Sequence, residues 1–213
     1  MAKREPLTRA RIVDAAAAVA DEAGLEGVSM RSVGRKLGVE AMSLYHHIGS
    51  KDELLDELAD WVFARYRSPA PDAGWRDGIR DRTVSVRETL TAHPWGLMLV
   101  DSRTSGGVGT YVHYEAMLGS LRRGGFSVEE AGHIYSVIDS YVYGFVLTEQ
   151  KLPIKVGGLE DFVGDLGTPL EGFPYMMEFV AAKVAAGSYA YANEFDVGLD
   201  LLLDAFATRL PPD

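Results

Sequence analysis

The chain has 213 residues, no cysteine, 47% hydrophobic residues and a formal net charge of −10. This composition excludes a globally disordered chain, a disulfide scaffold and a thiolate metal site. The N-terminal residues show no apolar segment of a secretion signal and no apolar run approaches the ~20 residues of a membrane helix, so we expect no membrane partner and a cytoplasmic location.

The N-terminal pattern predicts three helices. The first starts at about Arg9 and stops at Gly24. The next two cover residues 30–37 and 41–47 and are separated by Gly38. Two short helices joined by a tight turn that contains glycine form a helix-turn-helix, and glycine supplies the positive φ that the turn needs.

A longer helix is predicted over residues 51–67, and residues 68–74 contain the prolines and glycine of a hinge. We therefore expect a head over residues 1–50, a connecting helix over 51–67 and a body over 68–213. Residues 1–51 hold eight Lys or Arg and six Asp or Glu, whereas residues 52–213 hold 13 and 25. A slightly basic head on an acidic body is the charge distribution of a small DNA-binding module. The N-caps of these helices are predicted at Thr8, Ser29 and Ser50.

The body shows helical periodicity and no convincing strand pattern, which predicts an all-α fold of about ten helices. Its helices are expected at about residues 75–93, 94–101, 109–123, 128–150, 173–186 and 195–210. Residues 101–109 and 151–172 are rich in Gly and other breakers and predict loops.

The segment from Arg31 to Asp56 resembles the head of the tetracycline-repressor (TetR) family. The shared positions are Leu37-Gly38-Val39, Leu44-Tyr45, His47, Lys51 and Leu54-Leu55. Residues 125–127, 141–144 and 194–203 resemble the ligand-binding domain of the tetracycline repressors more weakly. The resemblance implies a repressor whose body binds a ligand and whose head leaves DNA in response. Gly34 departs from the family, which more often has Ala, and is expected to cost up to ~1 kcal/mol of helix stability.

The second short helix is expected to lie in the major groove of double-stranded DNA. Ala41 and Met42 can contact a thymine methyl, and Ser43 and His46 can form hydrogen bonds with base edges. By the resemblance, Tyr45, His47 and Lys51 hold phosphates, and Lys3, Arg4 and Arg9 are expected to add charge from the N-terminal arm. The expected DNA contacts are Ser29, Arg31, Ala41, Met42, Ser43, Tyr45, His46, His47 and Lys51.

No metal and no cofactor are expected. The neighbours His46 and His47 point about 100° apart on a helix, so they do not share a metal ion.

The helices expected at residues 128–150 and 195–210 are apolar on more than one side, which indicates burial on both faces. The resemblance implies that this pair forms a four-helix interface of a homodimer, and a larger monomer core is the alternative. A two-fold dimer requires an inverted-repeat operator with half-sites roughly 34–36 Å or a little more apart. The expected interface residues are Val137, Tyr141, Gly144, Leu199, Leu202 and Phe206.

A ligand site should combine apolar and aromatic side chains with a few polar groups. The expected ligand contacts are Trp95, Met98, Arg103, Tyr111, Tyr114, Met117, Tyr135 and Tyr141, with His113 and Glu149 as further polar partners. Tetracycline repressors hold a magnesium–drug chelate through an imidazole and a carboxylate, where this chain has Val100 and Thr148. We therefore expect an aromatic, largely apolar inducer, which tilts the helix at 51–67 beside Trp61 or Tyr66.

Two other classes of protein compete with this interpretation, a helical enzyme and a small-molecule carrier that does not bind DNA. No H-E-x-x-H, G-x-S-x-G or phosphate-loop motif is present, so we expect no enzymatic activity. The low net charge of the head leaves the carrier open. Activator and repressor are not distinguished by the sequence.

Overall fold

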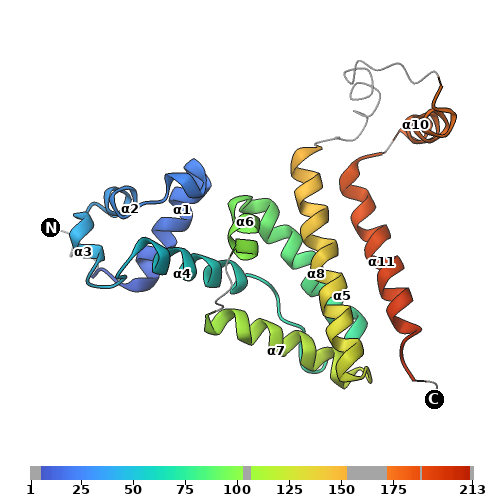
Figure 1. Cartoon of the computed structure of the whole chain (residues 1–213), viewed down its shortest axis with the longest axis horizontal. Coiled ribbons are helices and arrows are strands. Elements are labelled where there is room, and N and C mark those ends of the chain that lie inside the picture. Colours follow the sequence, from blue (N-terminus) through green and yellow to red (C-terminus); the bar gives the residue numbers. More distant parts are fainter. Residues whose placement is uncertain (1–5, 103–106, 153–171, 188, 212–213) are drawn as a thin grey trace. The chain divides into compact units, whose positions relative to one another are not determined.

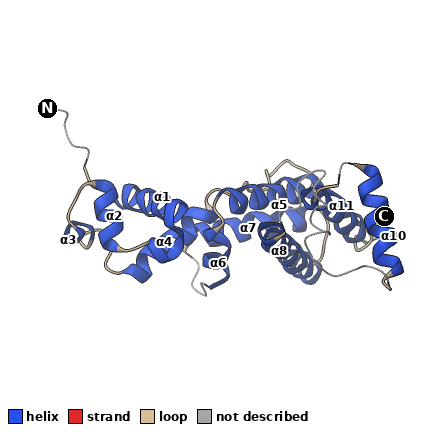
Figure 2. Ribbon diagram, turned by 90° about the horizontal axis from the view of Figure 1, so that it is seen from above, coloured by secondary structure: helices blue, strands red, loops and turns tan. Residues whose placement is uncertain are grey.

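The computed structural model describes residues 6–102, 107–152, 172–187 and 189–211. These residues form ten α-helices and one short 3-10 helix, with no strand among them, which confirms the predicted all-α class (Figures 1 and 2). The chain divides into two compact units, residues 1–139 and 140–213. Within the described ranges, no helix is long and apolar enough to cross a membrane.

Three helices form the head, α1 (Arg9–Gly27), α2 (Met30–Leu37) and α3 (Ala41–Leu44). Gly24 interrupts α1 with a φ of 68°, at the predicted stop. Gly38 ends α2 in the left-handed region, with a φ of 67° and a ψ of 35°. The positive φ predicted for the turn is therefore present.

The helix α3 ends three residues before the predicted end at residue 47. The carbonyl oxygen of Leu44 accepts from the backbone N–H groups of both His47 and Ile48, each at 2.9 Å. The chain therefore tightens into a turn after one helical turn. A helix this short has no stability of its own, so it depends on packing. Leu44 and Ile48, both fully buried beside Val33, supply that packing.

The helix α4 (Lys51–Phe63) begins at the predicted cap, because the Ser50 hydroxyl accepts from the Glu53 backbone N–H at 3.0 Å. In a capping box the Glu53 carboxylate would accept from the backbone N–H of Ser50. Here it accepts from the backbone N–H of Gly49 at 2.7 Å instead. The helix ends four residues before its predicted end at residue 67. The backbone N–H groups of Arg65 and Tyr66 donate to carbonyl groups three residues earlier, and the side chain of Tyr66 is buried.

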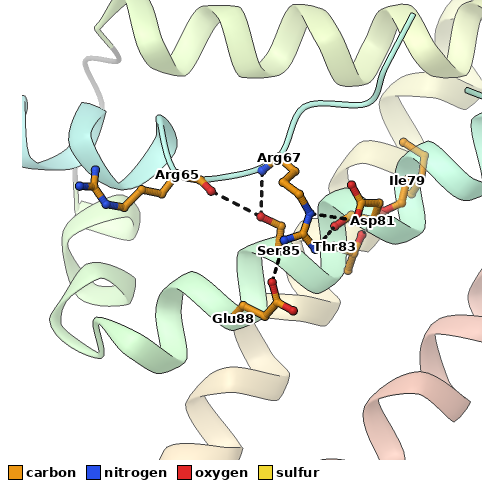
Figure 3. A network of polar contacts seen from close by, with 7 residues as sticks. All are labelled: Arg65, Arg67, Ile79, Asp81, Thr83, Ser85 and Glu88. Carbon is orange, nitrogen blue, oxygen red and sulfur yellow. Dashed lines mark hydrogen bonds and ion pairs between the residues drawn. The ribbon is translucent and has the colours of Figure 1, made fainter. Parts of the chain in front are cut away.

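Arg67 fixes the start of the predicted hinge onto the next helix, α5 (Trp75–Ala92) (Figure 3). Its backbone N–H donates to the Ser85 hydroxyl at 2.8 Å. Its guanidinium contacts Asp81 at 2.9 Å and Glu88 at 2.8 Å. Arg67, in the linker between α4 and α5, is therefore held against α5.

The other α-helices match the predicted ranges to within three residues, whereas the 3-10 helix η1 (Tyr191–Asn193) was not predicted. These α-helices are α6 (Trp95–Ser102), α7 (Val108–Arg123), α8 (Val128–Lys151), α10 (Pro174–Ala186) and α11 (Glu194–Ala207). The centres of the two predicted loops, residues 103–106 and 153–171, lie outside the described residues.

In the second unit, the C-terminal half of α8 packs on η1 and α11 through aromatic rings. Tyr141 stacks on Phe195 with ring centroids 5.5 Å apart, and its hydroxyl donates to the Phe195 carbonyl at 2.6 Å. Phe145 stacks on Tyr191 at 4.7 Å. Gly198 allows this approach, because a Cβ there would lie 2.5 Å from the Tyr141 hydroxyl.

Candidate functional site

The outer face of α3 and the turn that follows it present a mixed polar and apolar surface. Met42 is 73% exposed and Tyr45 45% exposed, although both are large. His46 is exposed, and Ala41, Ser43 and His47 are partly exposed. Leu44 and Ile48 point the other way, into the core. The expected base-reading and phosphate-holding side chains therefore share one outward surface.

Two further expected DNA contacts, Arg31 on α2 and Lys51 at the first position of α4, are exposed. The side chain of Ser29 is already engaged in a hydrogen bond that caps α2. Its hydroxyl accepts from Ser32 N–H at 3.1 Å, and the Ser32 hydroxyl accepts from Ser29 N–H at 2.9 Å. This reciprocal cap fixes the start of α2.

Arg9 contacts α4 and the turn after α3. Its guanidinium forms ion pairs with Glu53 and Glu57 and donates to the His47 carbonyl at 2.9 Å. The hydrogen bonds with Glu57 and Glu53 raise the pKa of Arg9. The Gly49 N–H, and then Arg9, lower the pKa of Glu53. This network ties α1 to α4 and to the turn after α3. The expected neutralisation of phosphate by Arg9 stays a prediction. Lys3 and Arg4 lie outside the described residues.

A second polar network joins the head to α4 and α6. The Trp61 indole N–H donates to Asp14 at 2.8 Å, and the Trp95 indole N–H donates to Asp21 at 2.6 Å. The Arg65 guanidinium lies 3.0 Å from the centre of the Trp61 ring. Trp61, beside which the inducer is expected to tilt the helix at 51–67, is therefore in direct contact with the head. The sequence did not reveal Asp14 and Asp21 as its partners, because acidic residues on an exposed helix face carry no distinguishing pattern.

The expected ligand contacts fall into separate places. Trp95 and Met98 line a surface hollow of about 470 Å³ between α1 and α6. Tyr111 is 64% exposed on α7. Tyr141 belongs to the second unit, and Arg103 lies outside the described residues.

The three remaining contacts, Tyr114, Met117 and Tyr135, lie on α7 and α8 in the first unit. Met117 is fully buried. The rings of Tyr114 and Tyr135 meet edge to face at 5.1 Å, and both are partly exposed. Burial, followed by the charge of Asp139, raises the pKa of the Tyr135 hydroxyl, which therefore stays neutral.

A buried polar cluster adjoins these tyrosines, and sequence reasoning missed most of it. Arg82 on α5 is fully buried, forms an ion pair with Asp139 on α8 at 2.6 Å, and donates from Nε to His113 Nε2 at 3.0 Å. Replacing such a pair with apolar side chains is often neutral or stabilising, so its presence is not explained by stability alone. Only His113 had been considered as a polar partner. No local pattern marks Arg82 and Asp139, which the fold brings together from distant positions.

His113 is neutral in this environment. It is 2% exposed, and burial followed by the nearby Arg82 charge lowers its pKa to about 3. Its ring lies among Phe63, Tyr66 and Tyr114, with centroids 5.8, 5.3 and 6.3 Å away. The Nδ1 atom meets no hydrogen-bond partner among the described residues. A buried donor left in this state costs about 1–3 kcal/mol.

The expected interface residues divide between exposed and buried positions. Val137 is 41% exposed, and Gly144 has open space at the position of a Cβ. Leu202 is partly exposed, but Leu199 and Phe206 are buried within the chain at 0% and 8% exposure.

Other residues of α11 form its outward apolar face. Val197 is 56% exposed and Leu201 67% exposed. The helix is apolar on more than one side, and the sequence could not decide which apolar side faces outward.

No group of three or more possible metal ligands occurs among the described residues. Val100, which stands where the tetracycline repressors have a metal-binding imidazole, is partly buried on α6. A valine side chain offers no lone pair to a metal.

Comparisons with known proteins cover both parts of the chain. Residues 12–58 match the family described as bacterial regulatory proteins, tetR family. Residues 68–210 match the family described as tetracyclin repressor-like, C-terminal domain.

The HTH-type transcriptional repressor DrrR1 of Streptomyces coeruleorubidus is 39% identical over 143 residues, or 65% of this chain and 52% of that protein. The chain thus spans about half the length of this relative. The tetracycline repressor protein class A from transposon 1721 of Escherichia coli is 29% identical, over 98% of this chain and 93% of that protein. The crystal structure of ActR from Streptomyces coelicolor in complex with (S)-DNPA has a TM-score of 0.75 and 27% identity, and the match covers 97% of this chain and 100% of that one.

Proposed function

The chain belongs to the tetracycline-repressor family of helix-turn-helix transcriptional regulators, and from this premise we propose that it is a homodimeric repressor released from an inverted-repeat operator by a small aromatic inducer. The family is one of regulators and not of enzymes. A helical enzyme is therefore no longer a competing interpretation. The proposal also places the chain in the cytoplasm, where bacterial DNA is accessible.

The observation that carries the proposal is the outward face of α3. Met42 and Tyr45 are exposed, while Leu44 and Ile48 are buried beneath them. Because these two large side chains are exposed, they contribute little to the packing of the head. They are suited instead to contact with base edges and with the sugar–phosphate backbone. This surface also favours a regulator over a carrier that has lost DNA binding.

Exposed apolar side chains in the second unit support a homodimer. Val197 and Leu201 face outward on α11, and α10 has no buried residue although it carries Tyr175, Met176 and Phe179. Exposed apolar surface of this extent is typical of an interaction site. A second copy of the chain is the occupant that we propose, because two copies also supply two copies of α3 to an inverted repeat.

Two observations support a small aromatic effector. The cluster around His113 combines aromatic rings with buried polar atoms, as ligand sites do. The solved complexes of ActR with (S)-DNPA and with actinorhodin show that a protein 27–28% identical to this chain binds small molecules.

Selection of duplexes from random DNA, followed by fluorescence anisotropy at several salt concentrations, tests the proposal. We expect an inverted repeat to be enriched, with an affinity that falls steeply as salt increases. Sedimentation of the complex should show two chains per site. A chain that stays monomeric and ignores every duplex at low salt would refute the proposal.

A further inference from the structure

The geometry around His113 determines which ring nitrogen carries its proton. The Nε–H of an arginine can only donate, so the His113 Nε2 atom that lies 3.0 Å from Arg82 Nε must accept. A neutral imidazole has one N–H, which is therefore at Nδ1. This N–H is buried and has no acceptor among the described residues.

The surroundings of this donor are aromatic. Phe63 is the last residue of α4 and Tyr66 lies in the turn that follows it, whereas Tyr114 comes from α7, the same helix as His113. Tyr114 in turn contacts Tyr135, and both are partly exposed. The aromatic contacts of His113 therefore extend through Tyr114 to Tyr135, and both tyrosines are partly exposed.

The charges of the cluster are balanced before any ligand binds. Arg82 pairs with Asp139 at 2.6 Å, and the Tyr135 hydroxyl that faces Asp139 is neutral. A carboxylate ligand would compete with Asp139 for Arg82 and would leave a buried charge unpaired. A positively charged ligand would meet the same guanidinium.

We infer that the inducer is an uncharged aromatic ketone or quinone, whose carbonyl oxygen accepts the Nδ1–H of His113 while its rings pack among Phe63, Tyr66 and Tyr114. This inference rests on the proposed ligand-responsive function and narrows its ligand class. The carbonyl supplies the missing acceptor, and the flat rings match the aromatic wall. The ligand would then contact the end of α4, the helix that leads to the head.

The first test compares two probes that differ only in the carbonyl group, 9-fluorenone and fluorene, by equilibrium dialysis against the full chain. We expect fluorenone to bind about tenfold more tightly than fluorene, as one well-made hydrogen bond to a buried donor allows. The anionic analogue 9-fluorenone-2-carboxylate should bind more weakly than fluorenone. Equal binding of fluorenone and fluorene, or tighter binding of the carboxylate, would overturn the inference.

A matched pair of variants assigns the preference to His113. His113→Phe keeps an aromatic ring but has no N–H, so its ratio of fluorenone to fluorene affinity should fall to about one. Leu121→Met changes another buried residue of α7 with little change of volume, and should keep the wild-type ratio. A wild-type ratio in His113→Phe would contradict the inference.

The second test needs no variant, so it does not depend on folding of His113→Phe. In ¹⁵N-histidine-labelled wild-type protein, the His113 ring should show a protonated Nδ1 and an unprotonated Nε2. Fluorenone should shift the Nδ1 resonance, whereas fluorene should leave it unchanged. A proton at Nε2 would overturn the inference.

The experiments distinguish failure of the inferred ligand class from failure of the proposed function. If operator DNA is bound and released by some ligand, but fluorenone has no advantage over fluorene, the ligand class is wrong and the proposed function stands. If no duplex is bound, the proposed function is wrong, and the ketone preference can still be measured by dialysis.

Discussion

The indole N–H of Trp95 donates to the Asp21 carboxylate at 2.6 Å and so joins the first residue of α6 to α1. His93 Nδ1 lies 2.7 Å from the same carboxylate oxygen. A single acidic residue of α1 thus contacts two side chains, one just before α6 and one at its first residue. Both hydrogen bonds depend on the position of α1.

Replacing Asp21 should destabilise the chain more than replacing its neighbour. Asp21→Ala leaves the Trp95 N–H, on a residue only 7% exposed, without its acceptor, which costs about 1–3 kcal/mol. Glu22→Ala removes only an exposed ion pair with Lys36, worth roughly 0–1 kcal/mol. Urea denaturation of both variants measures the difference, and equal losses would show that the contact at Trp95 contributes little.

Two glycine-to-alanine substitutions should change stability in opposite directions. A Cβ on Gly34 would lie 2.9 Å from the Val39 carbonyl oxygen, so Gly34→Ala should displace the turn and cost about 1–3 kcal/mol despite its better helix propensity. Gly132 in α8 has open space around it, so Gly132→Ala should stabilise by up to ~1 kcal/mol. Gly34→Ala should also weaken operator binding. Thermal melts and anisotropy check both expectations, which fail if Gly34→Ala behaves like Gly132→Ala.

Arg9 and Lys51 should affect DNA binding in different ways. Lys51→Met should weaken binding and reduce the slope of log affinity against log salt by about two, because two phosphate contacts are lost per dimer. Arg9→Met should leave that slope unchanged, since the Arg9 guanidinium is bonded to Glu53 and Glu57, and should lower stability instead. An Arg9→Met variant that is fully stable but has a reduced slope would show that Arg9 does contact phosphate.

The buried His113 predicts a loss of stability in mild acid. Its pKa is lowered to about 3 in the folded chain, below the unfolded value of 6.5. The stability that it contributes is therefore complete above pH 6.5 and is lost progressively as the pH falls toward 3. Between pH 7 and pH 5 the loss should be about 2 kcal/mol. The variant His113→Phe lacks this term, so its free energy of unfolding should fall less over the same interval in urea titrations.

The outward face of α11 should control the proposed dimer. Leu201→Glu places a charge on an apolar side chain that is 67% exposed, and should give a monomer in sedimentation equilibrium. Val128→Glu changes a side chain that is 74% exposed at the start of α8, in the first unit, and should remain dimeric. If both variants dimerise, the interface lies elsewhere.

The helices could be predicted from the sequence because their ends depend on local chemistry. Thr8, Ser29 and Ser50 cap the helices that follow them, and Gly38 adopts the left-handed conformation expected of it. The early end of α4 was not predictable, since it depends on the burial of Tyr66 in the core.

The polar parts of the site depend on contacts between distant segments. The sequence predicts a positive charge at Arg9 but not its ion pairs with Glu53 and Glu57, which are more than 40 residues away along the chain. The pairing of Arg82 with Asp139 requires α5 and α8 to lie together. Periodicity gives the face of a helix that is apolar, but it does not give the partner of a charged side chain.

In the proposed repressor, the single turn of α3 makes operator binding depend on the packing of the head, and therefore on temperature. Its shape exists only while Leu44 and Ile48 remain in the core of the head, so partial melting of the head removes the reading surface at once. Warming that leaves the body folded would then relieve repression without any inducer. The proposed repressor would thus respond to temperature through its head as well as to a ligand through its body.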